Sequence, residues 1–168
     1  PEVDSSYFAE ILSGASEALH EQDMRVVLCP TLHEHEREVV LLDRLMHGTT
    51  DGALLLLPSE SEDELRTLLN HGYPFVVVEP RTALGDGIPC VTSTHSTGAA
   101  AATEHLLELG HRRIGAILGP REGLATTERL KGFHAALRAA GIAPEPSLEV
   151  PSNFKYDGGE QAAGELLD

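Results

Sequence analysis

Short apolar runs alternate along the chain with longer stretches in which apolar residues recur every three or four positions. The recurrence is typical of one face of a helix, and an uninterrupted apolar run is typical of a strand covered on both faces. The predicted strands are residues 25–29, 53–57, 75–78, 90–92, 114–118 and 148–150. The predicted helices are centred on residues 6–20, 39–46, 65–69, 99–109, 130–140 and 157–167. This alternation predicts an α/β fold in which helices cover both faces of parallel sheets.

Several helix boundaries and faces follow from the same pattern. A hydroxyl residue followed three positions later by a carboxylate forms a capping box, which predicts helix starts at Thr31 with Glu34 and at Ser61 with Glu64. The buried face of the helix that ends before Gly110 is predicted to carry Ala99, Ala102, Leu106 and Leu109.

Composition narrows the class of protein. The 168 residues are 41% hydrophobic and 23% charged, which is typical of a globular chain. The net charge of −15 disfavours this segment as a DNA-binding surface, because phosphate contacts need a basic footprint. The distant cysteines Cys29 and Cys90 are interpreted as buried free thiols in a reducing cytoplasm. The sequence shows neither an apolar run of transmembrane length nor a leader, so a cytoplasmic protein without a membrane partner is predicted.

A family resemblance enters with the segment ELGHRRIG-x-I-x-GP…ER-x-x-GF-x-x-AL-x-x-AG, which spans residues 108–141. This segment resembles the matching part of the LacI/GalR family of bacterial transcriptional repressors. The similarity extends from SSYFAEILSGASEAL near the start to F-x-Y-x-x-G-x-x-AA-x-x-LL at the end, and so covers essentially the whole chain. Five ordered pieces at the family's spacing carry the resemblance.

The resemblance implies an architecture. Two Rossmann-like, doubly wound parallel-sheet lobes of the type I periplasmic-binding-protein kind are expected, with residues 1–110 in the N-terminal lobe and residues 111–168 in part of the C-terminal lobe. The first strand of such a sheet is central. The chain begins directly before a helix, where the family has just finished that strand, so we expect a natural protein that is longer at both ends.

Ligands of open parallel sheets bind beyond the carboxyl ends of the strands. That rule selects a set of loop positions that holds aromatics, hydroxyls and few charges, as suits a small neutral polar ligand such as a sugar or a base. The selected positions are Thr31, Ser59, 79–81, Thr94, His95, 119–125 and 152–154, joined by Tyr7 and Phe8 if a strand precedes residue 1.

Three aromatic residues and one arginine match ligand-contacting positions of the family. Tyr7 and Phe8 match an aromatic pair at the cleft, although Phe8 could instead continue a buried helix stripe. Phe154 matches a cleft aromatic, and the alternative is a staple onto the following helix. Arg129 matches the position whose guanidinium binds effector oxygens, whereas an isolated arginine beside Glu128 would be a surface charge.

Other positions depart from the family or carry simpler explanations. Thr94 and His95 stand where relatives commonly have an acidic residue with Asn or Tyr, so the effector cannot be inferred from a relative; His95 could equally cap the next helix. The run from His33 to Glu36 lacks HExxH spacing and is interpreted as a solvated helical turn rather than a metal site. No phosphate-binding loop, cofactor motif or Ser-His-acid elbow is found, so no cofactor and no catalysis are predicted.

These observations predict the effector-binding and dimerisation region of a LacI/GalR-like repressor. Its partners would be a small effector (a sugar or a nucleobase-like molecule), a second copy of the chain, and operator DNA reached only through a headpiece that is absent here. Two alternatives stay open: a solute-binding protein of a sugar transport system, which shares the fold, and an α/β enzyme of unrecognised type.

Overall fold

The computed structural model describes residues 6–32 and 34–167. The polypeptide divides into two compact units. Unit 1 consists of Pro1–Pro80 with Leu84–Val91, and unit 2 consists of Arg81–Ala83 with Thr92–Asp168. None of the described helices is long and apolar enough to cross a bilayer.

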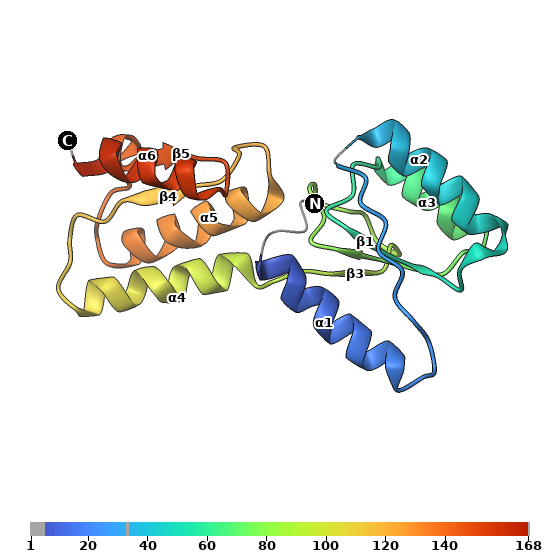
Figure 1. The fold of residues 1–168 in the computed structure, drawn as a ribbon. Coiled ribbons are helices and arrows are strands. Elements are labelled where there is room, and N and C mark those ends of the chain that lie inside the picture. The colour runs from blue at the N-terminus through green and yellow to red at the C-terminus, as the bar shows by residue number, and fades with distance from the viewer. Residues whose placement is uncertain (1–5, 33, 168) are drawn as a thin grey trace. The chain divides into compact units, whose positions relative to one another are not determined.

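Unit 1 contains a three-stranded parallel sheet of order β1-β2-β3. Ala53 of β1 pairs with Phe75 of β2, and Val77 of β2 pairs with Cys90 of β3. The elements of unit 1, shown in Figure 1, are α1 (Ser6–His20), α2 (His35–Arg44), the helical turn η1 (Leu45–Thr49), β1 (Ala53–Leu56), α3 (Glu62–Asn70), β2 (Phe75–Val78) and β3 (Cys90–Val91).

The core of unit 1 lies between the sheet and the helices α2 and α3. Leu42 of α2 and Leu65 and Leu68 of α3 are buried against Phe75 and Val77 of β2. Helix α1 has no buried residue, and Figure 1 shows it apart from α2 and α3. One face of the sheet is therefore densely covered, and α1 contributes little to the core.

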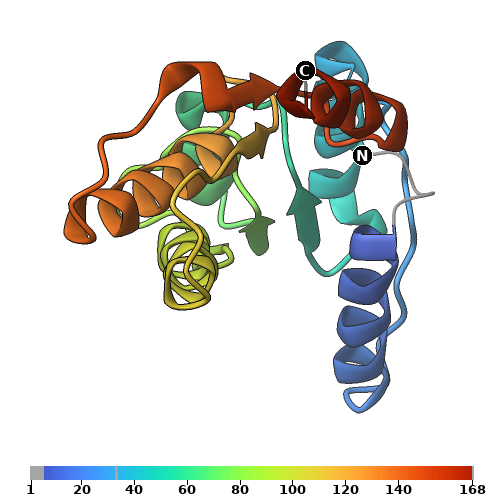
Figure 2. The same ribbon diagram turned by 90° about the vertical axis from the view of Figure 1, so that its left-hand side faces the viewer.

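Unit 2 contains a two-stranded parallel sheet in which Ala116 of β4 pairs with Glu149 of β5. Figures 1 and 2 show α5 and α6 on opposite sides of this sheet. The elements of unit 2 are α4 (His95–Glu108), β4 (Ala116–Leu118), α5 (Leu124–Ala139), the short 3-10 helix η2 (Pro146–Leu148), β5 (Glu149–Pro151) and α6 (Tyr156–Leu167).

Helices α4 and α5 meet at the backbone. A Cβ atom on the buried Gly132 of α5 would overlap the carbonyl oxygen of Ser96 in the first turn of α4. Any residue other than glycine would force the helices apart. Beside this contact Leu107, Ile114, Phe133 and Leu137 form the core of unit 2. The beginning of α4 is thereby fixed against the middle of α5.

The predicted fold class is confirmed. From β1 to α6 strands and helices follow one another in the expected order, and all three observed strand pairs are parallel. The capping box at Ser61 is also confirmed, because Glu64 N–H donates to the Ser61 hydroxyl and Ser61 N–H donates to the Glu64 carboxylate over 2.8 Å.

Two predictions of secondary structure, one of a strand and one of a helix start, are wrong. Residues 25–29 form no strand, although the run is rich in β-branched residues, because no described strand pairs with it. Helix α2 begins at His35 with Glu34 as its N-cap, and the Thr31 hydroxyl donates instead to Glu38 Oε1 over 2.7 Å. A longer-range partner has therefore taken the hydroxyl that the capping box would have used.

Two predictions about burial are also wrong. In α4 the buried residues are Thr103 and Leu107, whereas Leu106 and Leu109 of the predicted face are exposed. Cys29 and Cys90 are free as expected, but both are exposed. The boundary between the two compact units falls near residue 92, because α4 packs on α5. The predicted boundary between the lobes of the family fold, at residues 110 and 111, stays a prediction.

Candidate functional site

Arg129 and Phe154 meet in unit 2, as members of one site would. The guanidinium carbon of Arg129, in the second turn of α5, lies 5.6 Å from the centre of the Phe154 ring in the loop between β5 and α6. A guanidinium at this distance over an aromatic face is attracted by the electron-rich ring. Both side chains are exposed, so a planar cation and an aromatic face stand together at the surface of the unit.

Gly119 makes the position of Phe154 possible. Gly119 directly follows β4, and a Cβ atom there would overlap the Phe154 ring. Phe154 is nevertheless 60% exposed, and its backbone is left-handed, with φ of +62°. A left-handed phenylalanine costs free energy that the surrounding structure must supply. The ring thus contacts the end of β4 and faces α5. The alternative role of Phe154, a staple onto α6, would not require either contact.

Two buried hydroxyls of unit 2 have no hydrogen-bond partner in the part of the chain that the structure describes. They are Thr126 Oγ1, one turn before Arg129, and Ser152 Oγ, two residues before Phe154. Ser152 also borders a cavity of about 240 Å³ between β5 and α6. A buried hydroxyl without a partner costs free energy, so each is a candidate for a hydrogen bond to something that binds here.

Thr94 and His95 lie at the beginning of α4. Thr94 is the N-cap residue, its side chain makes no capping bond, and His95 is the first helical residue. The alternative in which His95 caps the helix is therefore wrong. Because Ser96 touches α5 one turn after Arg129, the α4–α5 contact places this helix start next to the Arg129 segment. A ligand-contacting role for Thr94 and His95 stays a prediction.

Tyr7 and Phe8 form an edge-to-face aromatic pair in the first turn of α1. Their ring centres lie 5.3 Å apart with an interplanar angle of 75°. Tyr7 is exposed, whereas Phe8 is half-buried and lines a cavity inside unit 1. Both belong to unit 1, as does Ser59, and a role of these residues in ligand contact stays a prediction.

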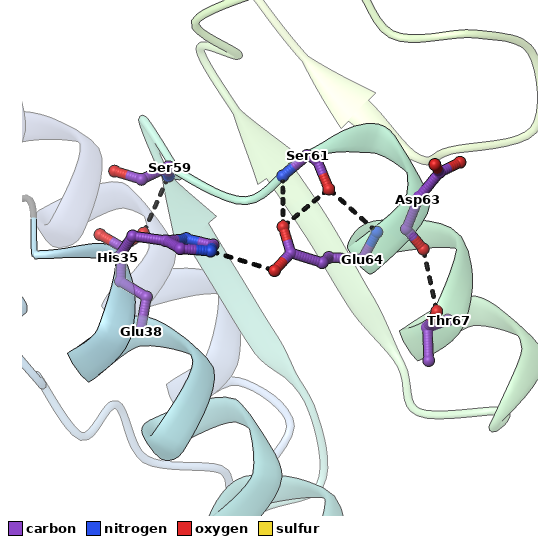
Figure 3. A network of polar contacts seen from close by, with 7 residues as sticks. All are labelled: His35, Glu38, Ser59, Ser61, Asp63, Glu64 and Thr67. Carbon is purple, nitrogen blue, oxygen red and sulfur yellow. Dashed lines mark hydrogen bonds and ion pairs between the residues drawn. The ribbon is translucent and has the colours of Figure 1, made fainter.

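Ser59 is part of a polar network at the carboxyl end of β1 (Figure 3). Its backbone N–H donates to Glu38 Oε2 over 2.8 Å, and the Thr31 hydroxyl donates to the other oxygen of the same carboxylate. Nearby, His35 Nε2 lies 3.1 Å from Glu64 Oε1. The network joins α2, the loop after β1 and the start of α3, so Ser59 has a structural function whether or not it touches a ligand.

Two buried carboxyls of this network titrate differently. Burial alone would raise the pKa of Glu38, but the hydrogen bonds from Thr31 and Ser59 outweigh it and hold that pKa below the usual value of 4.5. Burial raises the pKa of Glu60 to about 7, and the neighbouring negative charge of Glu38 adds to the increase. The pair therefore holds a proton on Glu60 well above the pH at which carboxyls ordinarily ionise.

The sequence did not reveal every feature of the candidate site. Gly119 as the seat of Phe154 and the Glu38–Glu60 pair both depend on contacts across the chain. Leu57 after β1 and Glu79 after β2 share the left-handed backbone of Phe154, at φ of +47° and +54°. Sharp turns in this strained region are typical of functional loops. Nothing in the sequence indicates this left-handed backbone, however, since neither residue is glycine or asparagine.

No group of three or more histidine, cysteine or carboxylate side chains is placed to hold a metal ion among the residues that the structure describes. His33, with which the histidine-rich run opens, lies outside the described residues. The interpretation of that run as a solvated helical turn therefore remains a prediction at His33.

Comparison with known proteins identifies the family. The profile of periplasmic binding proteins and the sugar-binding domain of the LacI family matches residues 1–168. The transcriptional regulator CelR of Thermobifida fusca is 35% identical over 166 residues, which are 96% of this chain and 48% of CelR. The transcriptional repressor CytR of Escherichia coli K12 is 31% identical over 172 residues, which cover 100% of this chain and 49% of CytR. The chain thus spans about half the length of these relatives.

The fold comparison agrees. The solved structure of a complex of CelR with cellobiose superposes with a TM-score of 0.78 at 35% identity, over 96% of this chain and 50% of that structure. The relatives named here are regulators of transcription, neither transport proteins nor enzymes. Together with the parallel α/β architecture, these matches show that the chain belongs to the family of periplasmic binding proteins and LacI-type sugar-binding domains.

Proposed function

We propose that this chain is the effector-binding part of a LacI-family transcriptional repressor, and that it binds a small neutral polar molecule such as a sugar. The observation that carries the proposal is the pairing of the Arg129 guanidinium with the Phe154 ring. An aromatic face stacks against the apolar face of a sugar ring, and a guanidinium donates two hydrogen bonds to neighbouring oxygens. The Thr126 hydroxyl, one turn before Arg129 and without a partner among the described residues, would supply a further polar contact.

Regulation would follow from linkage. An effector changes the affinity of a repressor for its operator only if it binds one arrangement of the protein more tightly than another. The chain's charge of −15 suits an effector-binding part better than a DNA-binding surface. We therefore propose a cytoplasmic homodimer whose contact with operator DNA is made by a separate headpiece.

A thermal-shift screen tests this function. Cellobiose and ribose, followed by nucleosides and purine bases, are added to the chain and the unfolding temperature is measured. We expect one class to raise it, because a ligand that binds only the folded state stabilises that state. Arg129→Ala should abolish the shift and leave the unliganded unfolding temperature nearly unchanged, since Arg129 is exposed.

Arg138→Ala is the matched control, because Arg138 is an exposed arginine in the last turn of the same helix. That variant should retain the ligand-induced shift. A screen without any stabilising ligand, or an Arg129→Ala protein that responds like the unaltered chain, would remove the support for an effector site at Arg129. A large fall in the unliganded unfolding temperature would make Arg129 a structural residue.

A further inference from the structure

A connection of four residues, 152–155, joins the end of β5 to the start of α6. Its last residue is already held by the helix, because the Lys155 carbonyl accepts a hydrogen bond from the Gly159 N–H over 3.0 Å. Within the connection Phe154 has the left-handed backbone, with φ of +62°. Phenylalanine does not adopt this backbone readily, so neighbouring contacts must stabilise it.

The side chain of Asn153 spans this left-handed residue. Asn153 Oδ1 accepts a hydrogen bond from the Lys155 N–H over 2.9 Å. Asparagine and aspartate side chains that bond to the backbone two residues further on form an Asx turn, which replaces a turn made by the backbone alone. The hydrogen bond closes a ring of atoms that includes the backbone of Phe154. It therefore restrains the φ and ψ angles of Phe154.

Gly158 gives the Asn153 side chain the space that it occupies. A Cβ atom on Gly158, in the first turn of α6, would overlap Asn153 Oδ1 and lie 2.8 Å from Ser152 Oγ. The next residue, Gly159, has open space at the equivalent place. Glycine is a poor helix former in comparison with alanine. Close packing against Asn153 is a reason for glycine at position 158 that does not apply at position 159.

The restrained backbone directs the aromatic ring. The direction in which a side chain leaves the chain is set by the backbone angles of its own residue. In this backbone the Phe154 ring reaches the place that a Cβ atom on Gly119 would take, and it lies 5.6 Å from the guanidinium carbon of Arg129. Rotation of Phe154 to an extended backbone would turn the ring away from both.

We propose that Asn153 is a positioning residue for the aromatic wall of the candidate site. Its hydrogen bond to Lys155 holds Phe154 in the left-handed backbone, and that backbone keeps the ring beside Arg129. Asn153 acts through Phe154 and not by contact with a ligand. The importance of this arrangement for binding rests on the proposed effector site, whereas the arrangement itself is measured without a ligand.

Magnetic resonance of the unliganded 168-residue chain, prepared with isotope-labelled glycine, tests the arrangement. The ring current of Phe154 shifts the Hα signals of Gly119, and Phe154→Leu gives their position without a ring. Asn153→Ala should move these signals toward the ring-free position. Asn153→Asp should keep them in place, because a carboxylate oxygen accepts the same hydrogen bond. Asn70→Ala is the control, since Asn70 is the other asparagine of the chain and is exposed at the end of α3.

Two adjacent glycines give an independent test. Gly158→Ala should displace the Asn153 side chain, and it should move the Gly119 signals in the same direction as Asn153→Ala. Gly159→Ala should leave those signals in place and raise the unfolding temperature, because alanine is the better helix former. Both glycines lie in α6, so helix propensity does not explain a difference between the two variants.

Titration with cellobiose and with ribose separates this proposal from the effector proposal. A sugar that binds should bind about tenfold more weakly to Asn153→Ala, a smaller loss than removal of the ring causes. When Phe154 is already alanine, Asn153→Ala should cause no further loss, because the two residues act as a unit. If neither sugar binds and the Gly119 signals still depend on Asn153, the proposal of a sugar effector loses its support and the positioning role stands.

Three results would overturn the positioning role. The first is a Gly119 signal that is the same in Asn153→Ala as in the unaltered chain. The second is an equal displacement of that signal in Asn153→Asp, because the hydrogen bond to Lys155 would then be irrelevant. The third is a loss of sugar affinity on Asn153→Ala that is the same with and without the Phe154 ring, because Asn153 would then contact the ligand itself.

Discussion

Gly119 and Phe154 share one small volume at the ends of two neighbouring strands. The aromatic ring lies where a side chain at position 119 would begin, because a Cβ on Gly119 would overlap its atoms. Because Gly119 has no side chain, the ring can lie over the end of β4, within reach of the Arg129 guanidinium. A residue that no ligand needs to touch thus determines where the aromatic wall of the candidate site stands.

Gly119→Ala should displace the ring of Phe154 and weaken effector binding by at least tenfold. The ring is largely exposed and can move aside, so the unfolding temperature of the unliganded chain should change by only a few degrees. Isothermal titration with the sugar that gives the largest thermal shift measures the effect. Gly164→Ala, at a helical position with open space around it, is the control and should bind normally. Normal binding by Gly119→Ala would mean that the ring's position is irrelevant to the ligand.

Phe154→Ala should reduce affinity by about thirtyfold if the ring stacks on the effector, since a hot-spot contact is worth about 2 kcal/mol. The same titration gives the affinity, and thermal unfolding gives the stability. Tyr156→Ala removes a neighbouring aromatic that is 87% exposed at the start of α6, and it should leave affinity unchanged. Unaltered affinity for Phe154→Ala with a lower unfolding temperature would assign the ring to packing.

Thr126→Val should stabilise the unliganded chain and weaken effector binding about fivefold. Valine has nearly the same shape and removes a buried hydroxyl that has no partner among the described residues, while a lost hydrogen bond to the ligand costs about 1 kcal/mol. Thr103→Val is the matched control in the same unit, because Thr103 is equally buried and its hydroxyl donates to Ala99 O over 2.7 Å. That control should not be stabilised, and it should bind the effector normally. If Thr126→Val is destabilising, the hydroxyl has a structural partner.

The Glu60 carboxyl should make stability fall as pH rises from about 4.5 to 7. Its pKa is raised to about 7 in the folded chain against 4.5 ordinarily, so the folded state holds a proton that the unfolded state releases in this range. Glu60→Gln should remove the decrease and raise stability at pH 8 by no more than about 3 kcal/mol. Urea unfolding between pH 4 and pH 8 measures both.

Two features sharpen the test of Glu60. Glu38 acts in the opposite sense: its lowered pKa contributes stability above pH 4.5, which is lost as the pH falls through the folded value. Glu104→Gln, at an exposed position on α4, should leave the pH profile unchanged. A profile that is the same for Glu60→Gln and the unaltered chain would show that Glu60 ionises normally.

The sequence predicted the features that local pattern determines. Ala53–Leu56 and Phe75–Val78 are uninterrupted apolar runs, and their parallel pairing follows from the helix between them. The capping box at Ser61 needs only residues three apart. The prediction of a strand at residues 25–29 was wrong, because a strand also needs a partner strand. The prediction of a capping box at Thr31 was wrong, because the Thr31 hydroxyl donates to Glu38, seven residues away.

The candidate site was predicted only in part, because some of its features depend on contacts between residues that are distant in sequence. Resemblance to the family named Arg129 and Phe154, and the structure brings these two together. The prediction of the buried face of α4 was wrong because adjacent leucines and many alanines are compatible with two different apolar faces. The contact between Gly132 and Ser96 favours the face that buries Leu107. The raised pKa of Glu60 arises from burial and from Glu38, which is distant in sequence. Such effects become visible only when segments are placed side by side.

The left-handed backbone of Phe154 limits which side chains can occupy this position of the candidate site. β-Branched and other bulky side chains are strongly disfavoured at φ of +62°, whereas glycine, asparagine, aspartate and histidine tolerate it. A library that samples all amino acids at 154 should therefore return a narrow set of folded variants. A new ligand preference at the proposed site would arise more easily at an exposed helical neighbour such as Arg129, where the backbone sets no such restriction. The shape of one loop thus limits which residues can form the aromatic wall of the candidate site.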